Sequence, residues 1–252
     1  MSFIGVIVAV MFILVANLLE GGHISGLINA PAFLIVIGGT IGAILVQFSF
    51  SSVKLVFTYF SWLWMPPLRD SFGTAKQMVD LAVIARRDGL LALEIELEKV
   101  QDPFLLEALQ MLVDGLEKDA ILDVMENKIA AEEQRIGQVA KIYEAMGGYS
   151  PTMGILGAVL GLIHAMGLLD KPDQLGAGIA VAFVATIYGV AFANIVFLPF
   201  GNRYKAFSYE LTNYRQMVLE GVSCIATGSN AIELQSRLGG YVAHPMFVKG
   251  AS

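Results

Sequence analysis

Charged residues are scarce in this sequence: Asp, Glu, Lys and Arg together make up 15% of it, whereas 56% of the residues are hydrophobic. Soluble domains contain about 25% charged and about 45–50% apolar residues. The chain therefore has more apolar side chains than one globular core needs, and we expect a membrane protein. The net charge of −6 and the scattered basic residues leave no patch for nucleic acid, so that class of partner is excluded.

Cysteine is almost absent as well. Cys224 is the single cysteine, which excludes an internal disulfide, and no CxxC or Cys/His metal-binding spacing surrounds it. We expect it to be a small packing residue. No nucleophile and base pair and no metal motif stand out elsewhere, so the sequence predicts neither an enzyme nor a bound metal or cofactor.

Four long apolar stretches predict four transmembrane helices. Residues 3–19 and 28–50 contain no charged side chain, and the third and fourth stretches are residues 151–169 and 176–200. Each approaches or exceeds the ~17–25 residues that cross a bilayer. The first has no basic segment before it and no clear cleavage site, so we interpret it as a retained span and not as a signal peptide. The spans form two hairpins, the second closed by the polar turn at residues 170–173.

The distribution of basic residues predicts the orientation in the membrane. Of the sixteen Lys and Arg, only Lys171 lies in a short loop between paired spans; the other fifteen lie in residues 51–150 and 201–252. Basic residues close to span ends, such as Lys54 and Arg203, carry most weight in the positive-inside rule. The rule predicts that both long segments and both termini are cytoplasmic.

The cytoplasmic segments have helical and not strand-like patterns. Asp102 followed by Pro103 predicts a helix start, and Asp114 followed by Gly115 predicts a stop. Apolar residues then recur with a helical period over residues 118–145, leading towards the third span. No strand-like alternation competes, so the predicted fold class is all-α.

A last short helix is predicted near the C-terminus. Asn230 and Glu233 have the spacing of a helix cap, and the helix should end at the Gly239-Gly240 break, before a loose tail. The predicted organisation is a first transmembrane hairpin, a cytoplasmic helical domain, a second hairpin that forms the wall of an ion path, and C-terminal cytoplasmic helices with the tail: residues 1–50, 51–150, 151–200 and 201–252.

Small residues recur at helical spacing in three of the spans. Such stripes let helix backbones approach closely in lipid. They fit one compact bundle or an oligomer, and their presence on several spans favours an oligomer. The residues are Gly38 and Gly42, then Gly157, Gly161 and Ala165, then Gly178, Ala182, Ala185, Gly189 and Ala193.

Spans three and four contain no Asp, Glu, Lys or Arg. Their titratable groups are His164 and, less usefully, Tyr188. A cation or proton path needs an ionisable or coordinating group at membrane depth. The chain therefore either transports nothing or forms the walls of a path whose carboxylate comes from a partner. His164 is a candidate proton relay, or alternatively a hydrogen-bonded packing residue.

The spans carry a family resemblance. PTMGILGAVLGLIHAMG (residues 151–167) and GAGIAVAFVATIYGVAFANIVFLPFGNR (176–203) resemble the third and fourth spans of the flagellar motility protein A family, most of all its MotC-like type. ARRDGLLALE (85–94) and LQMLVDG (109–115) resemble its cytoplasmic domain, and EGGHISGLINAPAFLIVIGGT (20–40) its first hairpin. The likeness covers nearly the whole chain in order.

This resemblance implies a stator subunit of the bacterial flagellar motor in the inner membrane, in contact with lipid. In that family a ring of A-type subunits surrounds a dimer of B-type subunits. Each B subunit has one span with an essential aspartate and a periplasmic peptidoglycan-binding domain. The missing carboxylate would then belong to the partner, and ion flow past it would turn the A ring against the rotor. The only small species involved would be the transported ion.

The resemblance also assigns roles to two prolines and to charges of the cytoplasmic domain. The functional prolines fall on Pro151 and Pro199; their alternative role is helix punctuation, in a first turn and near a helix end. The contacts to the rotor protein FliG fall on Arg86, Arg87 and Glu94. Arg86 and Glu94 are eight residues apart, a spacing that places them on one face of a continuous helix, although Gly89 between them can break that helix. Alternatively, the charges form only a solvated face.

One departure from the family lies near the C-terminus. Relatives often have Asn-Pro-Arg where this chain has Asn230-Ala231-Ile232, so a basic rotor contact is not expected there.

The choice of ion depends on hydroxyl groups in the spans. Thr186 can hydrogen-bond a partner's carboxylate, or it can bond back to the carbonyl one turn earlier. In sodium-driven relatives a second threonine faces this one, and here Ala158 takes that place, with Ala185 replacing another threonine. Because Na⁺ needs several oxygen ligands, we expect proton coupling.

Three other function classes are weighed against the stator. An ExbB/TolQ-type energiser would also form the walls of an ion path whose carboxylate comes from a partner. Such proteins resemble three-span chains, however, and this chain has a further apolar hairpin. A passive scaffold would also lack charges in its spans; a neighbouring gene for a single-span protein with an aspartate would distinguish the two. An autonomous transporter is not favoured, because no paired broken helices are evident.

Overall fold

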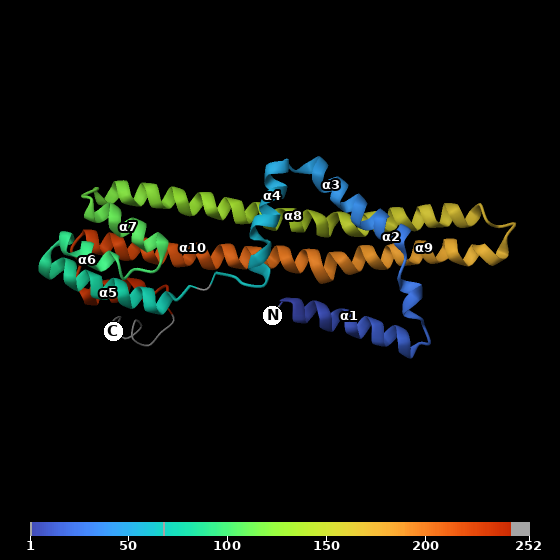
Figure 1. Ribbon diagram of the computed structural model, residues 1–252, viewed down its shortest axis with the longest axis horizontal. Coiled ribbons are helices and arrows are strands. Elements are labelled where there is room, and N and C mark those ends of the chain that lie inside the picture. Colours follow the sequence, from blue (N-terminus) through green and yellow to red (C-terminus); the bar gives the residue numbers. More distant parts are fainter. Residues whose placement is uncertain (1, 68, 243–252) are drawn as a thin grey trace. The chain divides into compact units, whose positions relative to one another are not determined.

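The computed structural model describes residues 2–67 and 69–242, and every regular element among them is a helix (Figure 1). This confirms the all-α prediction. The tail predicted after the Gly239-Gly240 break falls mainly on residues 243–252, which lie outside the described residues.

The chain divides into two compact units. The first comprises Met1–Pro66 and Arg135–Ala206, and the second comprises Pro67–Gln134 and Phe207–Ser252. Two long helices, α8 (Lys118–Met166) and α10 (Leu198–Ala226), each contribute one part to each unit.

The first unit contains the apolar stretches. Asn29 caps α2 by accepting a hydrogen bond from the Ala32 amide, and α2 and the π-helical segment η2 pack against α9. Besides its parts of α8 and α10, the elements are α1 (Ser2–Leu19), η1 (Ile24–Leu27), α2 (Ala30–Phe33), η2 (Leu34–Gly38), α3 (Gly39–Gln47), α4 (Phe50–Tyr59), η3 (Phe60–Leu63), α9 (Pro172–Ala191) and the π-helical η5 (Phe192–Phe197).

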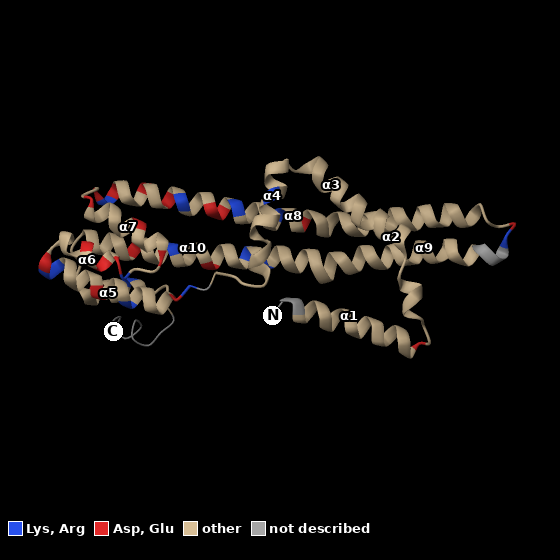
Figure 2. Ribbon diagram, viewed as in Figure 1, with Lys and Arg blue, Asp and Glu red and all other residues tan. Residues whose placement is uncertain are grey.

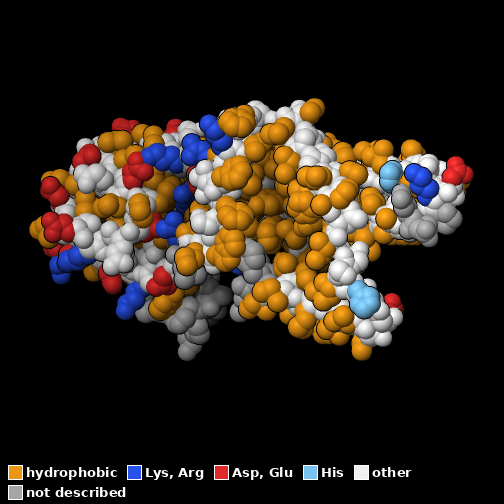
Figure 3. All heavy atoms as spheres, turned by 45° about the vertical axis from the view of Figure 1, so that its right-hand side comes forward, with side chains coloured by type: hydrophobic (Ala, Val, Ile, Leu, Met, Phe, Trp, Pro, Cys, Tyr) orange, Lys and Arg blue, Asp and Glu red, His pale blue; other side chains and the backbone are white. Residues whose placement is uncertain are grey.

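Three helical segments of the described chain are long and apolar enough to cross a bilayer: Ile24–Gln47, Lys118–Met166 and Leu175–Ala226. Ile4–Leu19 is apolar but shorter. Figure 2 shows few charged residues on α1–α3 and α9 and many on α5–α7. In the space-filling view, hydrophobic side chains form a broad surface with few charges across part of the molecule (Figure 3). Such exposed apolar side chains are typical of surfaces that face lipid or a partner in a membrane.

Helices α8 and α9 touch through their small residues. A Cβ atom added at Gly189 would lie 2.7 Å from the Ser150 carbonyl oxygen, and one added at Gly161 would lie 2.7 Å from the Ala182 amide nitrogen. The Ser150 hydroxyl, fully buried, donates to the Gly189 carbonyl at 3.0 Å. The stripe on these two helices therefore serves contact within one chain, as in the compact-bundle interpretation.

The second unit has a conventional apolar core. Its fully buried side chains include Met78, Leu93, Leu109, Met125 and Met217. Besides its parts of α8 and α10, its elements are α5 (Ser71–Asp88), η4 (Leu90–Leu93), α6 (Glu94–Leu97), α7 (Pro103–Val113) and α11 (Ala231–Leu238).

The predicted helix boundaries of this unit are confirmed. The Asp102 carboxylate accepts from the amides of Phe104 and Leu105, and α7 ends before Gly115, whose φ is +84°. The Asn230 side chain accepts from the Glu233 amide at 2.8 Å and so caps α11.

We predict that Gly189→Ala lowers the free energy of unfolding by about 1–3 kcal/mol, because the added methyl group forces the backbones of α8 and α9 apart. Gly176→Ala is the matched control on the same helix, since a Cβ there meets no atom within 4 Å. The measurement is denaturant unfolding of the full chain in detergent micelles. Equal losses for the two variants would show that the close contact does not stabilise this helix pair.

Candidate functional site

Thr186 lies on the exposed side of α9, in an apolar groove. The groove has a volume of about 370 Å³ and is lined also by Ile13, Val190 and Asn194. The Thr186 hydroxyl donates to the Ala182 carbonyl at 3.2 Å, as in the alternative of a bond one turn back. A hydroxyl that donates once keeps two acceptor lone pairs, so Thr186 can still accept a hydrogen bond from a protonated carboxyl group.

The two alanines that stand where relatives have threonine occupy different environments. Ala185 is fully buried and lies in a cluster with Ala32, Val36 and Val184. A Cβ added at Gly157 would come within 2.7 Å of the Ala185 methyl group, so the space beside Ala185 is filled by packing. Ala158 is half-buried on α8. Neither position supplies an oxygen ligand from its side chain.

Tyr188 is committed to a structural contact. Its hydroxyl donates to the Leu27 carbonyl and accepts from the Asn29 amide at 3.2 Å, and its ring meets those of Phe33 and Phe192 edge-on. The side chain thus holds the start of α2 against α9. His164 is exposed in the last turn of α8.

The two prolines sit inside long helical runs and not at the boundaries expected from sequence. Pro151 lies in the interior of α8, which corrects the first-turn interpretation. Its backbone is adjacent to Gly189, because a Cβ on that glycine would lie 3.2 Å from the Pro151 Cα. Proline removes one hydrogen bond from a helix interior, yet α8 runs unbroken through Pro151.

The expectation that Pro199 lies near the end of a helix is also wrong. This proline lies in the first turn of α10, directly after η5, and the helical run continues to Ala226 instead of ending nearby. A π-helical segment next to a proline is a frequent place for a helix to deform. Sequence reasoning missed both π-helical segments, since no residue type marks them; the proline after η5 was the one available signal.

Arg86, Arg87 and Glu94 are all exposed in the second unit. Gly89, with φ +87°, ends α5 at Asp88, and Glu94 begins α6. Arg86 and Glu94 therefore lie on different helices and do not share a helix face, and Gly89 is the break between them.

Arg87 is already paired with its neighbour. Its guanidinium group contacts the Asp88 carboxylate at 2.6 Å, and this hydrogen bond raises the pKa of Arg87 and lowers that of Asp88. No ion pair of Arg86 or Glu94 is found among residues 69–242, so these two charges are available to a partner.

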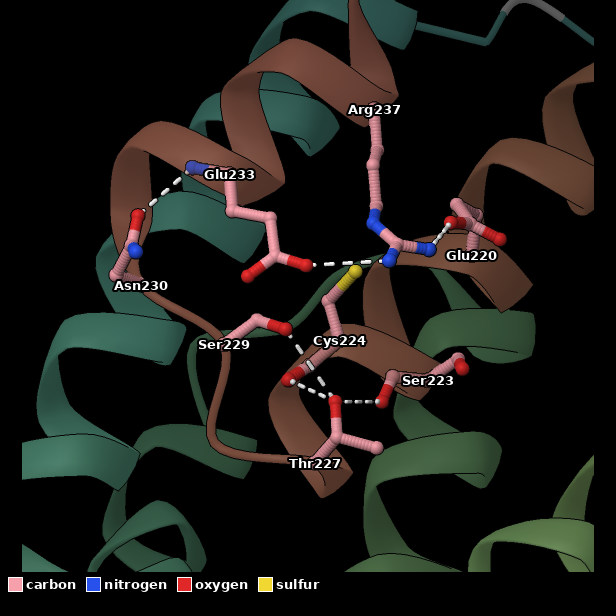
Figure 4. A network of polar contacts seen from close by, with 8 residues as sticks. All are labelled: Glu220, Ser223, Cys224, Thr227, Ser229, Asn230, Glu233 and Arg237. Carbon is pink, nitrogen blue, oxygen red and sulfur yellow. Dashed lines mark hydrogen bonds and ion pairs between the residues drawn. The ribbon is translucent and has the colours of Figure 1, made fainter.

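A polar network that the sequence did not reveal joins α10 to α11 (Figure 4). Arg237 donates to Glu220 at 2.9 Å and to Glu233 at 3.1 Å. Cys224 lies buried beside this network, and burial raises the pKa of its thiol. A buried thiol of raised pKa is unreactive, which agrees with the predicted packing role.

The chain is similar to known motility proteins over almost its whole length. Residues 96–217 match the MotA/TolQ/ExbB proton channel family. Motility protein A of Bacillus subtilis is 37% identical over 94% of this chain and 88% of the relative, and that of Helicobacter pylori is 32% identical over 96% and 94%. Chemotaxis protein PomA of Vibrio alginolyticus is 30% identical over 96% and 94%.

Solved structures of MotAB complexes are also similar to this chain. The structure of C. jejuni MotAB matches with a TM-score of 0.90 at 33% identity, covering 97% of this chain and 96% of the other. The flagellar MotAB stator complex of Bacillus subtilis matches with a TM-score of 0.88 at 37% identity, covering 100% and 99%. The family assignment made from the sequence is confirmed, and with it a multi-pass protein of the inner membrane. The chain belongs to the motility protein A group of the MotA/TolQ/ExbB proton channel family.

Proposed function

We propose that this chain is the ring-forming A subunit of a flagellar motor stator, which makes an ion channel with a B-type partner and converts ion flow into torque. The observation that carries the proposal is the match, over nearly the full length of both chains, to solved MotAB complexes. The ExbB/TolQ alternative is less supported, because relatives named as motility proteins match over 94% and 96% of this chain. The same matches argue against a passive scaffold.

The proposed membrane topology has four spans. They are α1, the run from α2 to α3, the part of α8 after Pro151, and α9 with η5. The 18 residues of α1 extend for about 27 Å, close to the ~30 Å hydrocarbon core of a bilayer. The hairpins at residues 1–50 and 151–200 would lie in the membrane, and residues 51–150 and 201–252 with both termini would lie in the cytoplasm.

The ion path requires a second chain. From Thr152 to Leu169 and from Leu175 to Asn202 the spans contain no acidic or basic side chain except His164. A B-type aspartate would provide the titratable group, because a bare charge at this depth costs several kcal/mol. Thr186 would accept a hydrogen bond from the protonated carboxyl, and Pro151 and Pro199 would be the places where the helices adjust as the carboxyl changes its charge.

The side chains around Thr186 suit a proton better than Na⁺. Na⁺ must replace its water shell with several oxygen atoms. The Thr186 groove offers one hydroxyl and the Asn194 amide, whose nitrogen already donates to the Val190 carbonyl at 2.9 Å. A proton needs only the partner's carboxylate and a route to it. We therefore propose proton coupling.

We predict that vesicles containing the chain alone show no proton leak above that of empty vesicles, since the spans hold no carboxylate. In cells that lack a stator, motility should appear only when the chain and its B-type partner are expressed together. It should persist in sodium-free medium and stop when an uncoupler collapses the proton gradient.

The partner with its span aspartate replaced by asparagine is the control, and it should abolish motility without reducing the amount of complex. Proton leak through the chain alone would overturn the need for a partner's carboxylate. Motility that requires sodium and survives the uncoupler would overturn proton coupling.

Rotor contact is proposed for the exposed charges of the second unit. Arg86, Glu94 and the Arg87–Asp88 pair are the candidates, and the rotor protein FliG is the proposed partner. Exposed charges of this kind set orientation and approach rate more than binding strength, so opposite charges are expected on the partner surface.

We predict that Arg86→Glu lowers swimming speed by at least about twofold, because it reverses a charge that has no ion pair among the described residues, at the proposed rotor contact. Lys76→Glu is the matched control, since Lys76 is exposed on the same helix, α5. Swimming speed is measured alongside the amount of the chain in the membrane. If both variants swim alike, the Arg86 charge is only a solvated surface group.

A further inference from the structure

A short helical segment of the first unit lies across its two long helices. It comprises α4, η3 and the two residues after them, and we call residues 50–65 the crossing segment. The Ser52 hydroxyl donates to the Gln138 side chain of α8 at 3.4 Å, and the Tyr204 hydroxyl of α10 donates to the Tyr59 carbonyl at 2.9 Å. Figure 1 shows α4 running across α8 and not along it.

The crossing segment lies where charged residues give way to apolar ones along α8. Tyr204, which bonds to the segment, stacks on Tyr143 of α8 with ring centroids 5.4 Å apart. Tyr143 comes just before Ala145, from which the chain contains no Asp, Glu, Lys or Arg as far as Leu169. A headgroup layer of about 5–8 Å covers each side of the hydrocarbon core. In the proposed topology, the crossing segment is therefore at the level of the cytoplasmic headgroups.

The crossing segment has a buried face and an exposed apolar face. Tyr59 and Leu63 are buried, whereas Phe57 and Met65 are 77% and 81% exposed. Aromatic side chains are enriched at the level of lipid headgroups, and three of the five large apolar side chains on the exposed face are phenylalanines and one is a tryptophan. These five side chains are Phe50, Phe57, Phe60, Trp64 and Met65. The exposed face therefore fits the boundary between lipid and water.

Two lysines accompany the exposed face. The Lys54 ammonium group lies 5.0 Å from the centre of the Phe50 ring, one turn earlier on α4. Lys141 follows Gln138, the α8 residue that Ser52 contacts, by three residues. Both lysines are exposed, and neither has a carboxylate partner in residues 2–67 and 69–242. Ammonium groups at this level attract the negatively charged phospholipids of the cytoplasmic leaflet.

We propose that the crossing segment docks on anionic phospholipids of the cytoplasmic leaflet. Its exposed aromatic face enters the headgroup layer, and Lys54 and Lys141 bind lipid phosphate groups. Because the same segment is hydrogen-bonded to α8 and α10, this contact fixes the depth of both helices in the bilayer. The inference rests on the proposed membrane topology, and it specifies the class of lipid that the chain selects.

Tryptophan fluorescence tests the proposal, because the two tryptophans of the chain, Trp62 and Trp64, both lie in the crossing segment. Trp62→Phe leaves the exposed Trp64 as the only one. The full chain is reconstituted in vesicles of equal parts phosphatidylcholine and phosphatidylglycerol, and one of the two lipids carries bromine atoms, which quench a tryptophan on contact. We expect brominated phosphatidylglycerol to quench Trp64 at least about twofold more than brominated phosphatidylcholine, since the lysines enrich the anionic lipid there.

Variants of the lysines separate headgroup recognition from contact with lipid in general. Lys54→Gln combined with Lys141→Gln should bring the ratio of the two quenching values to about one, whereas the aromatic face keeps the total quenching. Lys76→Gln is the matched control, because Lys76 is exposed in the second unit, and it should leave the ratio unchanged.

A ratio near one before the lysines are changed, or a ratio that the double variant leaves as it was, would refute the proposal. Absence of quenching by either lipid would refute it as well, because a protein surface such as a second copy would then cover Trp64. The measurement uses neither the B-type partner nor the rotor, so its outcome is separate from that of the motility tests.

Discussion

The close approach of α8 to α9 is the contact around which the membrane-facing unit is arranged. At Gly154, Gly161 and Gly189 no side chain separates the two helices, and backbone atoms of one lie in van der Waals contact with the other. In lipid there is little hydrophobic force between helices, so such contacts and a few hydrogen bonds hold them together. The buried Ser150 hydroxyl, bonded to the Gly189 carbonyl, fixes the register of the pair.

The other features of the candidate site depend on this pairing. While α9 is held against α8, its adjacent face meets α2 and η2, and Ala185 takes part in both contacts. On that face Tyr188 bonds to the loop before α2. Thr186 remains on an exposed side, in a groove lined by apolar residues. Pro151 also lies at this contact, inside α8 and next to Gly189 of α9.

The distribution of charged residues suggests separate roles for the two parts of the proposed motor subunit. The spans carry almost no charge, whereas the second unit carries many charged side chains. Because the spans contain no acidic side chain, the titratable carboxylate of the proposed ion path is assigned to the B-type partner. The second unit is built like a soluble domain, with a buried aliphatic core and exposed charges. In the proposed motor subunit, its helices would present Arg86 and Glu94 to a rotor, and the spans would form the wall of the ion path with the Thr186 hydroxyl.

The amino-acid sequence by itself determined the membrane class, the all-α fold, the family and the helix boundaries at Asp102, Gly115 and Asn230. The membrane class, the fold and the helix boundaries depend on composition or on residues within one or two helical turns, so they are readable without a structure. The family came from the resemblance of whole stretches of the sequence to its members. The back-bond of Thr186 to Ala182 is of the same local kind.

Tertiary structure decided which surfaces meet. Only the folded chain shows that the small-residue stripes of α8 and α9 face each other, that the Tyr188 hydroxyl is used by Leu27, and that Ala185 is buried. Likewise, the turn at Gly89 separates Arg86 from Glu94, whereas the sequence left open whether the two residues share one helix face. The physical reason is that a periodic pattern gives each helix a face, whereas the partner of that face is chosen by packing between segments far apart in the chain.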